Sequence, residues 1–165
     1  LFVNDLSAEV DGPSWLHPAY KKISVKTELL ELNRSVSFTI KHNGFDRISN
    51  VKVLHERKFK FDSNSFEIED RLMGDGTCDL RLCFHYSPEV EAPENKGADL
   101  AFKNIGAIFH VDSRCNRRVV SGESQSPVGG LCSPEYGVVS QCTTLNFDTV
   151  IKLPANIKNR LSFSL

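Results

Sequence analysis

The sequence has 165 residues, of which 40% are hydrophobic and 25% are charged, and its formal net charge is -1. This length and composition fit one folded domain with a hydrophobic core and exclude a disordered chain. The near-zero charge argues against nucleic-acid binding, which requires a basic excess or stripe. No apolar run approaches the roughly 20 residues that a membrane-spanning helix needs, so we expect no membrane partner.

The first residues differ in character from the rest. The sequence starts at Leu1 without an initiator Met or a signal peptide, which favours a piece of a longer protein over a complete one. Residues 1–18 contain Trp15 and two prolines, and we expect them to form a connecting segment that packs on a neighbour. Residues 19–165 are then expected to form the domain itself.

Alternation of apolar and polar residues predicts strands along most of the chain. Ser35–His42 alternates strictly, and Asn43-Gly44 after it is a strong tight-turn signal. Residues 28–32 fit a helical turn, whereas residues 24–28 before them alternate like a strand. Further strands are expected at 51–57, 58–61, 66–72, 78–85, 101–104, 107–111, around Val138 and Leu145, and at 150–153 and 161–165. Polar loops are expected at 89–97 and 121–134. Many short strands between turn signals predict an all-β antiparallel sandwich.

Three polar residues, His55, Asp70 and His85, interrupt apolar strand patterns at equal spacing, with positions 55, 70 and 85 fifteen residues apart. One strand plus a turn plus the next strand needs about that length, so the side chains can lie across neighbouring strands. Two imidazoles and a carboxylate are a common zinc set with one position left for water. The spacing therefore makes these residues candidate zinc ligands.

A competing interpretation is that these residues are ordinary hydrogen-bonded or ion-paired side chains. Each shares a strand face with apolar residues, and a carboxylate on such a face is costly unless it is paired or coordinated. A metal would relieve that cost, and so would an ion pair of Asp70 with Arg57 or Arg71. Other histidines, including His42 and His110, are weaker candidates, and no serine or cysteine nucleophile motif is present.

Cysteine content leaves the redox state open. The odd number of cysteines leaves at least one unpaired unless partners lie outside the chain, and no CxxC pair supports a cysteine zinc ribbon. A disulfide is feasible in the turn-rich second half. The five cysteines are Cys78, Cys83, Cys115, Cys132 and Cys142.

Five short motifs follow one another between residues 35 and 155. They are His42-Asn-Gly-Phe45, Val53-Leu-His55-Glu-Arg57, Phe66-Glu-Ile-Glu-Asp70-Arg-Leu72 with Gly74, Leu80-Arg-Leu-Cys-Phe-His85 with Pro88, and Ser133-Pro-Glu-Tyr136-Gly137. In this order they resemble the C-terminal β domain of heparinase II/III-like polysaccharide lyases. The resemblance covers most of the chain and implies a supersandwich-like antiparallel β-sandwich.

The resemblance also implies a function. Such lyases cleave uronic-acid-containing polysaccharides by β-elimination, with their main catalytic residues on an upstream (α/α) toroid. Several members hold zinc in the sandwich through positions that match His55, Asp70 and His85. This chain contains no toroid, so we expect it to brace that domain and line a cleft for acidic polysaccharide, without cleaving alone. Such lyases are usually exported, which favours a periplasmic or secreted protein.

The alternative is a non-enzymatic secreted β-sandwich that binds saccharide or protein partners. Sugar-binding modules usually expose aromatic residues on one face, whereas this sequence has one Trp and three Tyr. The two interpretations differ in what the gene encodes upstream. The lyase interpretation requires a helical region of several hundred residues in the same reading frame.

Overall fold

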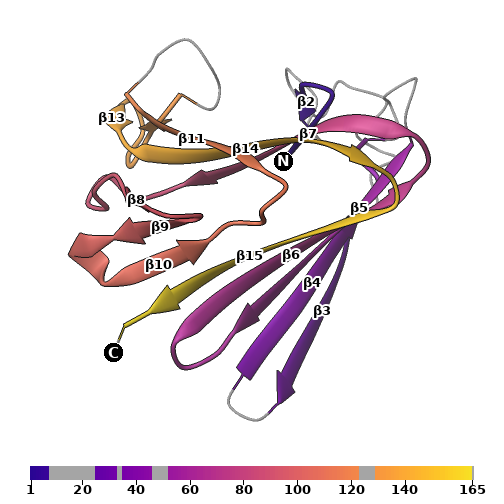
Figure 1. Ribbon diagram of the computed structural model, residues 1–165, viewed down its shortest axis with the longest axis horizontal. Coiled ribbons are helices and arrows are strands. Elements are labelled where there is room, and N and C mark those ends of the chain that lie inside the picture. Colours follow the sequence, from indigo (N-terminus) through magenta and orange to yellow (C-terminus); the bar gives the residue numbers. More distant parts are fainter. Residues whose placement is uncertain (8–24, 33–34, 46–51, 123–128, 165) are drawn as a thin grey trace.

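The computed structural model describes residues 1–7, 25–32, 35–45, 52–122 and 129–164, and these form antiparallel strands in two main layers (Figure 1). The elements are β1 Phe2–Val3, β2 Leu6–Ser7, β3 Val25–Leu32, β4 Ser35–His42, β5 Val53–Phe61, β6 Ser65–Gly74, β7 Thr77–His85, β8 Glu94–Lys96, β9 Asp99–Phe102, the 3-10 helix η3 Lys103–Ile105, β10 Ala107–His110, β11 Asn116–Ser121, β12 Leu131–Cys132, β13 Ser140–Gln141, β14 Thr143–Lys152 and β15 Ala155–Phe163. The described part of the chain has no helix able to cross a membrane.

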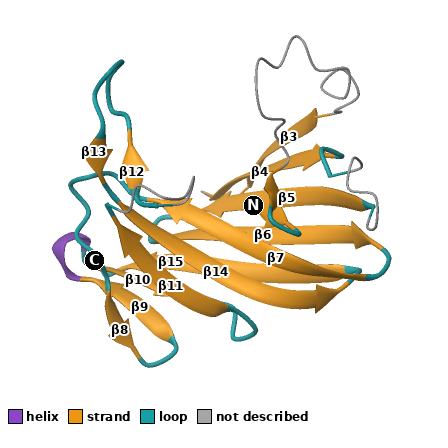
Figure 2. Ribbon diagram, turned by 90° about the horizontal axis from the view of Figure 1, so that it is seen from above, coloured by secondary structure: helices purple, strands orange, loops and turns teal. Residues whose placement is uncertain are grey.

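Two sheets carry the fold. One has the strand order β11-β14-β7-β1-β2, and the other has the order β3-β4-β5-β6-β15-β10-β9-β8. Strands β12 and β13 form a separate two-stranded ribbon, which projects beyond the sheets (Figure 2). All of these pairings are antiparallel. The predicted all-β antiparallel sandwich is confirmed.

The core lies between the two sheets because each strand turns its apolar residues to one side. Along β7, Leu80 and Leu82 are buried while the residues between and around them are more exposed. Phe147 on β14 is fully buried, and its ring stacks on that of Phe109 on β10 with centroids 5.5 Å apart. This ring pair joins the two layers directly.

Most predicted strands are confirmed, and β4 has the predicted bounds. Residues 51–57 and 58–61 were predicted separately, whereas β5 is one strand from Val53 to Phe61. Residues 28–32 lie in β3, so the helical alternative is wrong. Trp15 lies outside the described residues, and β1 and β2, within the predicted connecting segment, belong to the five-stranded sheet next to β7.

Several local predictions differ from the structure. Strand β8 lies inside the predicted loop 89–97, where Glu94, Asn95 and Lys96 are all exposed, so no apolar alternation marks the strand. Strand β11 also has mostly exposed residues, so apolar alternation does not mark it, and it is an edge strand of the five-stranded sheet. Residues 103–104 belong to η3, which ends at Gly106 in the left-handed region with φ 59°. The short strand expected around Val138 begins two residues later, at Ser140, as β13.

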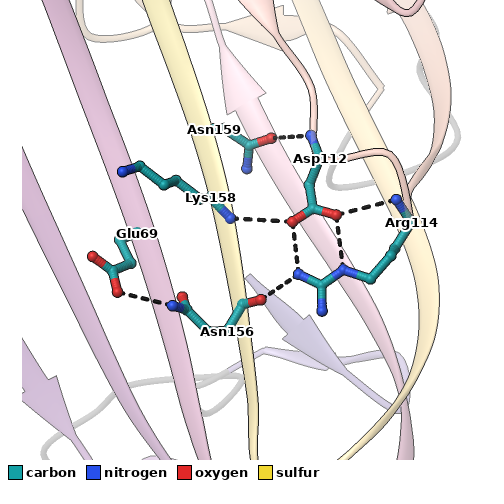
Figure 3. A network of polar contacts seen from close by, with 6 residues as sticks. All are labelled: Glu69, Asp112, Arg114, Asn156, Lys158 and Asn159. Atoms are coloured by element: carbon teal, nitrogen blue, oxygen red, sulfur yellow. Dashed lines mark hydrogen bonds and ion pairs between the residues drawn. The ribbon is translucent and has the colours of Figure 1, made fainter.

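A polar cluster fastens the turn after β10 to β15 (Figure 3). Arg114 donates to both carboxylate oxygens of Asp112, at 2.8 and 2.6 Å, and also to the backbone carbonyl of Asn156. The backbone N–H of Asp112 donates to Asn159 Oδ1 at 3.2 Å. The hydrogen bonds from Arg114 are the main cause that lowers the pKa of Asp112 to about 2. The cluster therefore stays ionised in all but strong acid.

Candidate functional site

A row of polar side chains crosses three neighbouring strands on the inner face of the eight-stranded sheet. Strand pairing places His42 of β4 directly opposite His55 of β5. Two residues further along β5, Arg57 lies opposite Asp70 of β6. Because residues two apart on a strand share a face, His55 and Arg57 point to the same side. Strand register thus brings four residues together, and we call them the inner polar row: His42, His55, Arg57 and Asp70.

Each member of the inner polar row contacts the next. His42 Nε2 lies 2.8 Å from His55 Nδ1, and His55 Nε2 lies 2.7 Å from Asp70 Oδ1. Arg57 donates through Nε to Asp70 Oδ1 at 2.6 Å and through Nη2 to Oδ2 at 3.0 Å. His55 is 4% exposed and Asp70 is fully buried, so these contacts form in a largely dry environment.

The hydrogen bonds of the row run in one direction. The backbone N–H of Gly44 donates to His42 Nδ1 at 3.2 Å, so the proton of neutral His42 is on Nε2. That proton is donated to His55 Nδ1, which leaves His55 to donate from Nε2 to Asp70. Both imidazoles are therefore held in one tautomer, and the chain ends on a carboxylate.

Asp70 is a buried carboxylate held in its charged form. Burial alone would raise its pKa, but the hydrogen bond from His55 and the charge and hydrogen bonds of Arg57 outweigh burial and lower the pKa. The Arg57 guanidinium carbon also lies 5.7 Å from the ring centroid of Phe84 on the opposite sheet. Arg57 is thus the ion-pair partner of Asp70 that the sequence offered as an alternative to a metal. Its guanidinium group also contacts a side chain of the opposite sheet.

His42 has the opposite requirement, because it must stay neutral. Burial, followed by the nearby His55, lowers the pKa of His42 from 6.5 to about 4. The unfolded chain therefore takes up the proton more readily than the folded chain does. The stability that depends on neutral His42 is present above about pH 6.5 and is lost as the pH falls from there towards 4.

We expect this titration to be measurable by urea unfolding at a series of pH values. Between pH 7 and 4, the free energy of unfolding of the native sequence should fall by about 1–2 kcal/mol more than that of the His42→Gln variant. This figure is discounted because His42 is only half-buried. Glutamine does not titrate in this range, so it removes the dependence while it keeps a polar side chain. Equal pH slopes for the two proteins would contradict the assignment.

Two clefts flank the inner polar row. One, of about 250 Å³, is lined by His42 and His55 together with Phe45 and Leu1. The other, of about 300 Å³, lies between the sheets and is lined by aromatic residues together with His85. Arg57 lines both clefts, so it forms part of the wall between them.

The structure brings two of the three predicted zinc ligands into contact and places the third nearby. His55 and Asp70 are hydrogen-bonded, whereas His85 lies at the exposed end of β7 in the other sheet. His85 Nδ1 is 2.9 Å from Thr144 Oγ1, and its side chain shares the second cleft with Arg57.

In this arrangement the donor atoms of His55 Nε2 and Asp70 contact protein partners. Both oxygens of Asp70 are taken by Arg57, and His55 Nε2 is taken by Asp70. Within the described ranges, no three His, Cys, Asp or Glu side chains are grouped closely enough to hold an ion. Zinc at His55, Asp70 and His85 stays a prediction, for which metal analysis of unchelated protein and of His55→Ala is the direct measurement.

Sequence patterns did not reveal a second polar arrangement on the same sheet. His110 Nδ1 is 2.9 Å from Asp99 Oδ2, and His110 Nε2 is 2.8 Å from Ser162 Oγ. The three residues come from β9, β10 and β15, and the side chain of His110 is 44% exposed. They lie on the surface of paired strands, and we interpret the cluster as a cross-strand tie between them.

Four phenylalanines continue the inner face beyond the inner polar row. The ring centroids of Phe38 and Phe59 are 4.5 Å apart, and those of Phe61 and Phe66 are also 4.5 Å apart. Phe61 is 40% exposed. Figure 1 shows the free ends of β3–β6 extending away from the five-stranded sheet. We call this partly uncovered surface, Phe38, Phe59, Phe61 and Phe66, the aromatic face.

These features define an antiparallel β-sandwich domain with a buried ion-paired row next to two clefts. A family model described as "Heparinase II/III-like, C-terminal" matches residues 1–158. The chain belongs to this family. No curated protein sequence matches it.

Several solved structures of similar fold are heparinases. The crystal structure of the heparan sulfate lyase HepC from Pedobacter heparinus aligns with a TM-score of 0.62 at 14% identity, over 83% of this chain and 21% of that one. A heparinase III with methylated lysines aligns with a TM-score of 0.57 at 12% identity, over 82% of this chain and 20% of that one. The likeness shows a shared fold, and this chain spans about a fifth of those proteins.

Proposed function

We propose that this chain is the C-terminal β-sandwich of a polysaccharide lyase, which cleaves uronic-acid-containing polysaccharide by β-elimination. Membership of the heparinase II/III-like C-terminal family is the observation that carries the proposal. The shared fold with a heparan sulfate lyase supports it. Because this chain spans about a fifth of such a protein, the groups that remove the C5 proton and protonate the leaving oxygen are assigned to the remainder.

Activity measurements on two lengths of protein test this proposal. The full-length protein should release unsaturated uronate from heparan sulfate or another acidic polysaccharide, seen as rising ultraviolet absorbance. The 165-residue chain alone should give no rise. Cleavage by the 165-residue chain alone would contradict the assignment of the catalytic groups to the remainder of the protein. A full-length protein that binds these polymers without cleaving any of them would support the non-enzymatic alternative.

We also propose that the aromatic face packs against the larger, upstream part of the same polypeptide, which the family resemblance identifies as an (α/α) toroid. Apolar surface of this kind is rarely left open on a soluble protein, and clustered rings mark interaction sites. Phe61, at 40% exposed, lies at the open end of the stack. The inner polar row, at the buried end, would hold β4, β5 and β6 in place beneath that contact.

A charge placed on the aromatic face tests the bracing role. In the full-length protein, Phe61→Glu should weaken domain packing by about 1–3 kcal/mol, because the new carboxylate would be buried without a partner. The expected readout is a split of one thermal transition into two and faster proteolysis between the domains. Val150→Glu, at a position 69% exposed on β14, is the matched control and should leave one transition. Identical melting of the two variants would contradict the proposal.

We further propose that the full-length protein acts in the periplasm or outside the cell, where its polymeric substrate would be met. Fractionation of the native host, followed by immunodetection, measures this directly.

A further inference from the structure

Two cysteines come together at the base of the β12–β13 ribbon. Cys132 pairs with Ser140, and Cys142 is the second residue after Ser140. Because side chains alternate along a strand, Cys132 and Cys142 lie on the same side of the ribbon as diagonal neighbours. The two side chains are within hydrogen-bonding contact of each other. The ribbon therefore brings two thiols together from positions ten residues apart, at 132 and 142.

Backbone contacts fix this approach. The N–H groups of Cys142 and Gly122 both donate to the carbonyl of Gly130, at 2.8 and 3.1 Å. Gly130 has a φ of 75°, and a Cβ at this position would lie 2.7 Å from the carbonyl oxygen of Cys142. Only glycine permits so close an approach. The base of the ribbon is thus clamped beside the two thiols.

The two cysteines differ in their access to solvent. Cys142 is buried, with 3% of its surface exposed, and Cys132 is partly exposed. Burial, followed by the contact with Cys132, raises the pKa of the Cys142 thiol. An external oxidant therefore meets Cys132 first. Of the other cysteines, Cys78 and Cys83 lie in β7 and Cys115 lies just before β11, so none of these three is part of the ribbon.

We propose that Cys132 and Cys142 are a disulfide-forming pair, oxidised by exchange with a small-molecule disulfide such as oxidised glutathione. The Cys132 thiolate attacks one sulfur of the small disulfide, and one thiolate leaves. The Cys142 thiolate then attacks Cys132 in this mixed disulfide and expels the second thiolate. Two protein thiols are oxidised, one small disulfide is reduced to two thiols, and the two protons released are taken up by the leaving thiolates.

This bond would close the tip of the ribbon into a covalent loop. The enclosed tip carries Tyr136, whose side chain is fully exposed, and Val139, which is 70% exposed. Cross-linking the base restricts the conformations of such a loop. The proposed disulfide would therefore fix how the exposed tyrosine is presented, without changing any residue of the two sheets.

Thiol mapping of the full-length protein tests the pairing. The protein is equilibrated with a range of reduced to oxidised glutathione ratios, blocked with iodoacetamide under denaturing conditions, and analysed by peptide mass spectrometry. The native sequence should lose the free thiols of Cys132 and Cys142 together, with a linked peptide joining them. Cys115→Ser is the matched control and should lose the same two thiols.

Single variants of the pair separate an internal bond from simple thiol reactivity. Cys142→Ser should leave Cys132 bound to glutathione, because the resolving thiol is missing. Cys132→Ser should leave Cys142 mostly free, because that thiol is buried. A linked peptide that joins either residue to a different cysteine would overturn the proposal, as would mixed disulfides without any internal bond in the native sequence.

Discussion

Replacing Arg57 with alanine should lower the free energy of unfolding by about 3–5 kcal/mol, measured by urea denaturation at neutral pH. The reason lies in Asp70, which is fully buried and receives two hydrogen bonds from Arg57. The variant removes the charge that balances this carboxylate and leaves His55 as its only remaining hydrogen-bond partner within the inner polar row. The cost is that of a buried charge without its counter-ion, and it exceeds that of a surface ion pair several-fold.

Two further proteins sharpen this measurement. Arg71→Ala removes an arginine that pairs with Glu69 on the exposed side of the same sheet, and it should cost about 1 kcal/mol or less. The double variant Arg57→Met with Asp70→Leu removes both charges and should recover most of the stability lost by Arg57→Ala. If Arg57→Ala cost no more than Arg71→Ala, the inner polar row would not be a stabilising element.

Truncating Phe147 to alanine should also cost about 3–5 kcal/mol, for an apolar reason. Phe147 is fully buried and stacks on Phe109 from the opposite sheet, with Phe84 5.6 Å away between ring centroids. Its removal leaves a cavity at the junction of the two layers, where paired strands cannot collapse without loss of their hydrogen bonds.

The control for this second prediction lies on the same strand. Val150 of β14 is 69% exposed, and Val150→Ala should change the free energy of unfolding by no more than about 0.5 kcal/mol. A small effect of Phe147→Ala would mean that the two layers are held together elsewhere. A large effect of Val150→Ala would point to loss of strand propensity as the dominant cost in both variants.

Sequence periodicity predicts the central strands well and the edges poorly, for a physical reason. Strands such as β6 and β7 have one buried face, so their apolar residues alternate visibly. The edge strand β8 has no buried face. It pairs with β9 through backbone hydrogen bonds, which do not depend on a pattern of apolar side chains. Tertiary context therefore decides its structure.

The candidate site was predictable in part for similar reasons. Strand parity predicts that His55 and Asp70 face inward, and the sequence offers Arg57 or Arg71 as the partner that neutralises Asp70. His42 is a weaker candidate in the sequence, because its role depends on the register between β4 and β5, which a single sequence does not specify. Equal spacing did not bring His85 into the row, because β7 belongs to the opposite sheet.

The ion pair in the inner polar row also acts on the alignment of the strands. Apolar alternation along β5 and β6 would tolerate a slip of two residues, since every inward side chain would still face inward. Such a slip would place Asp70 opposite Phe59 or His55 in place of Arg57, its partner in the observed register. An unbalanced carboxylate in the interior would make each shifted alignment costly. The pair thus selects one register among several that hydrophobic burial alone would accept, and so determines which rings of the aromatic face lie opposite one another.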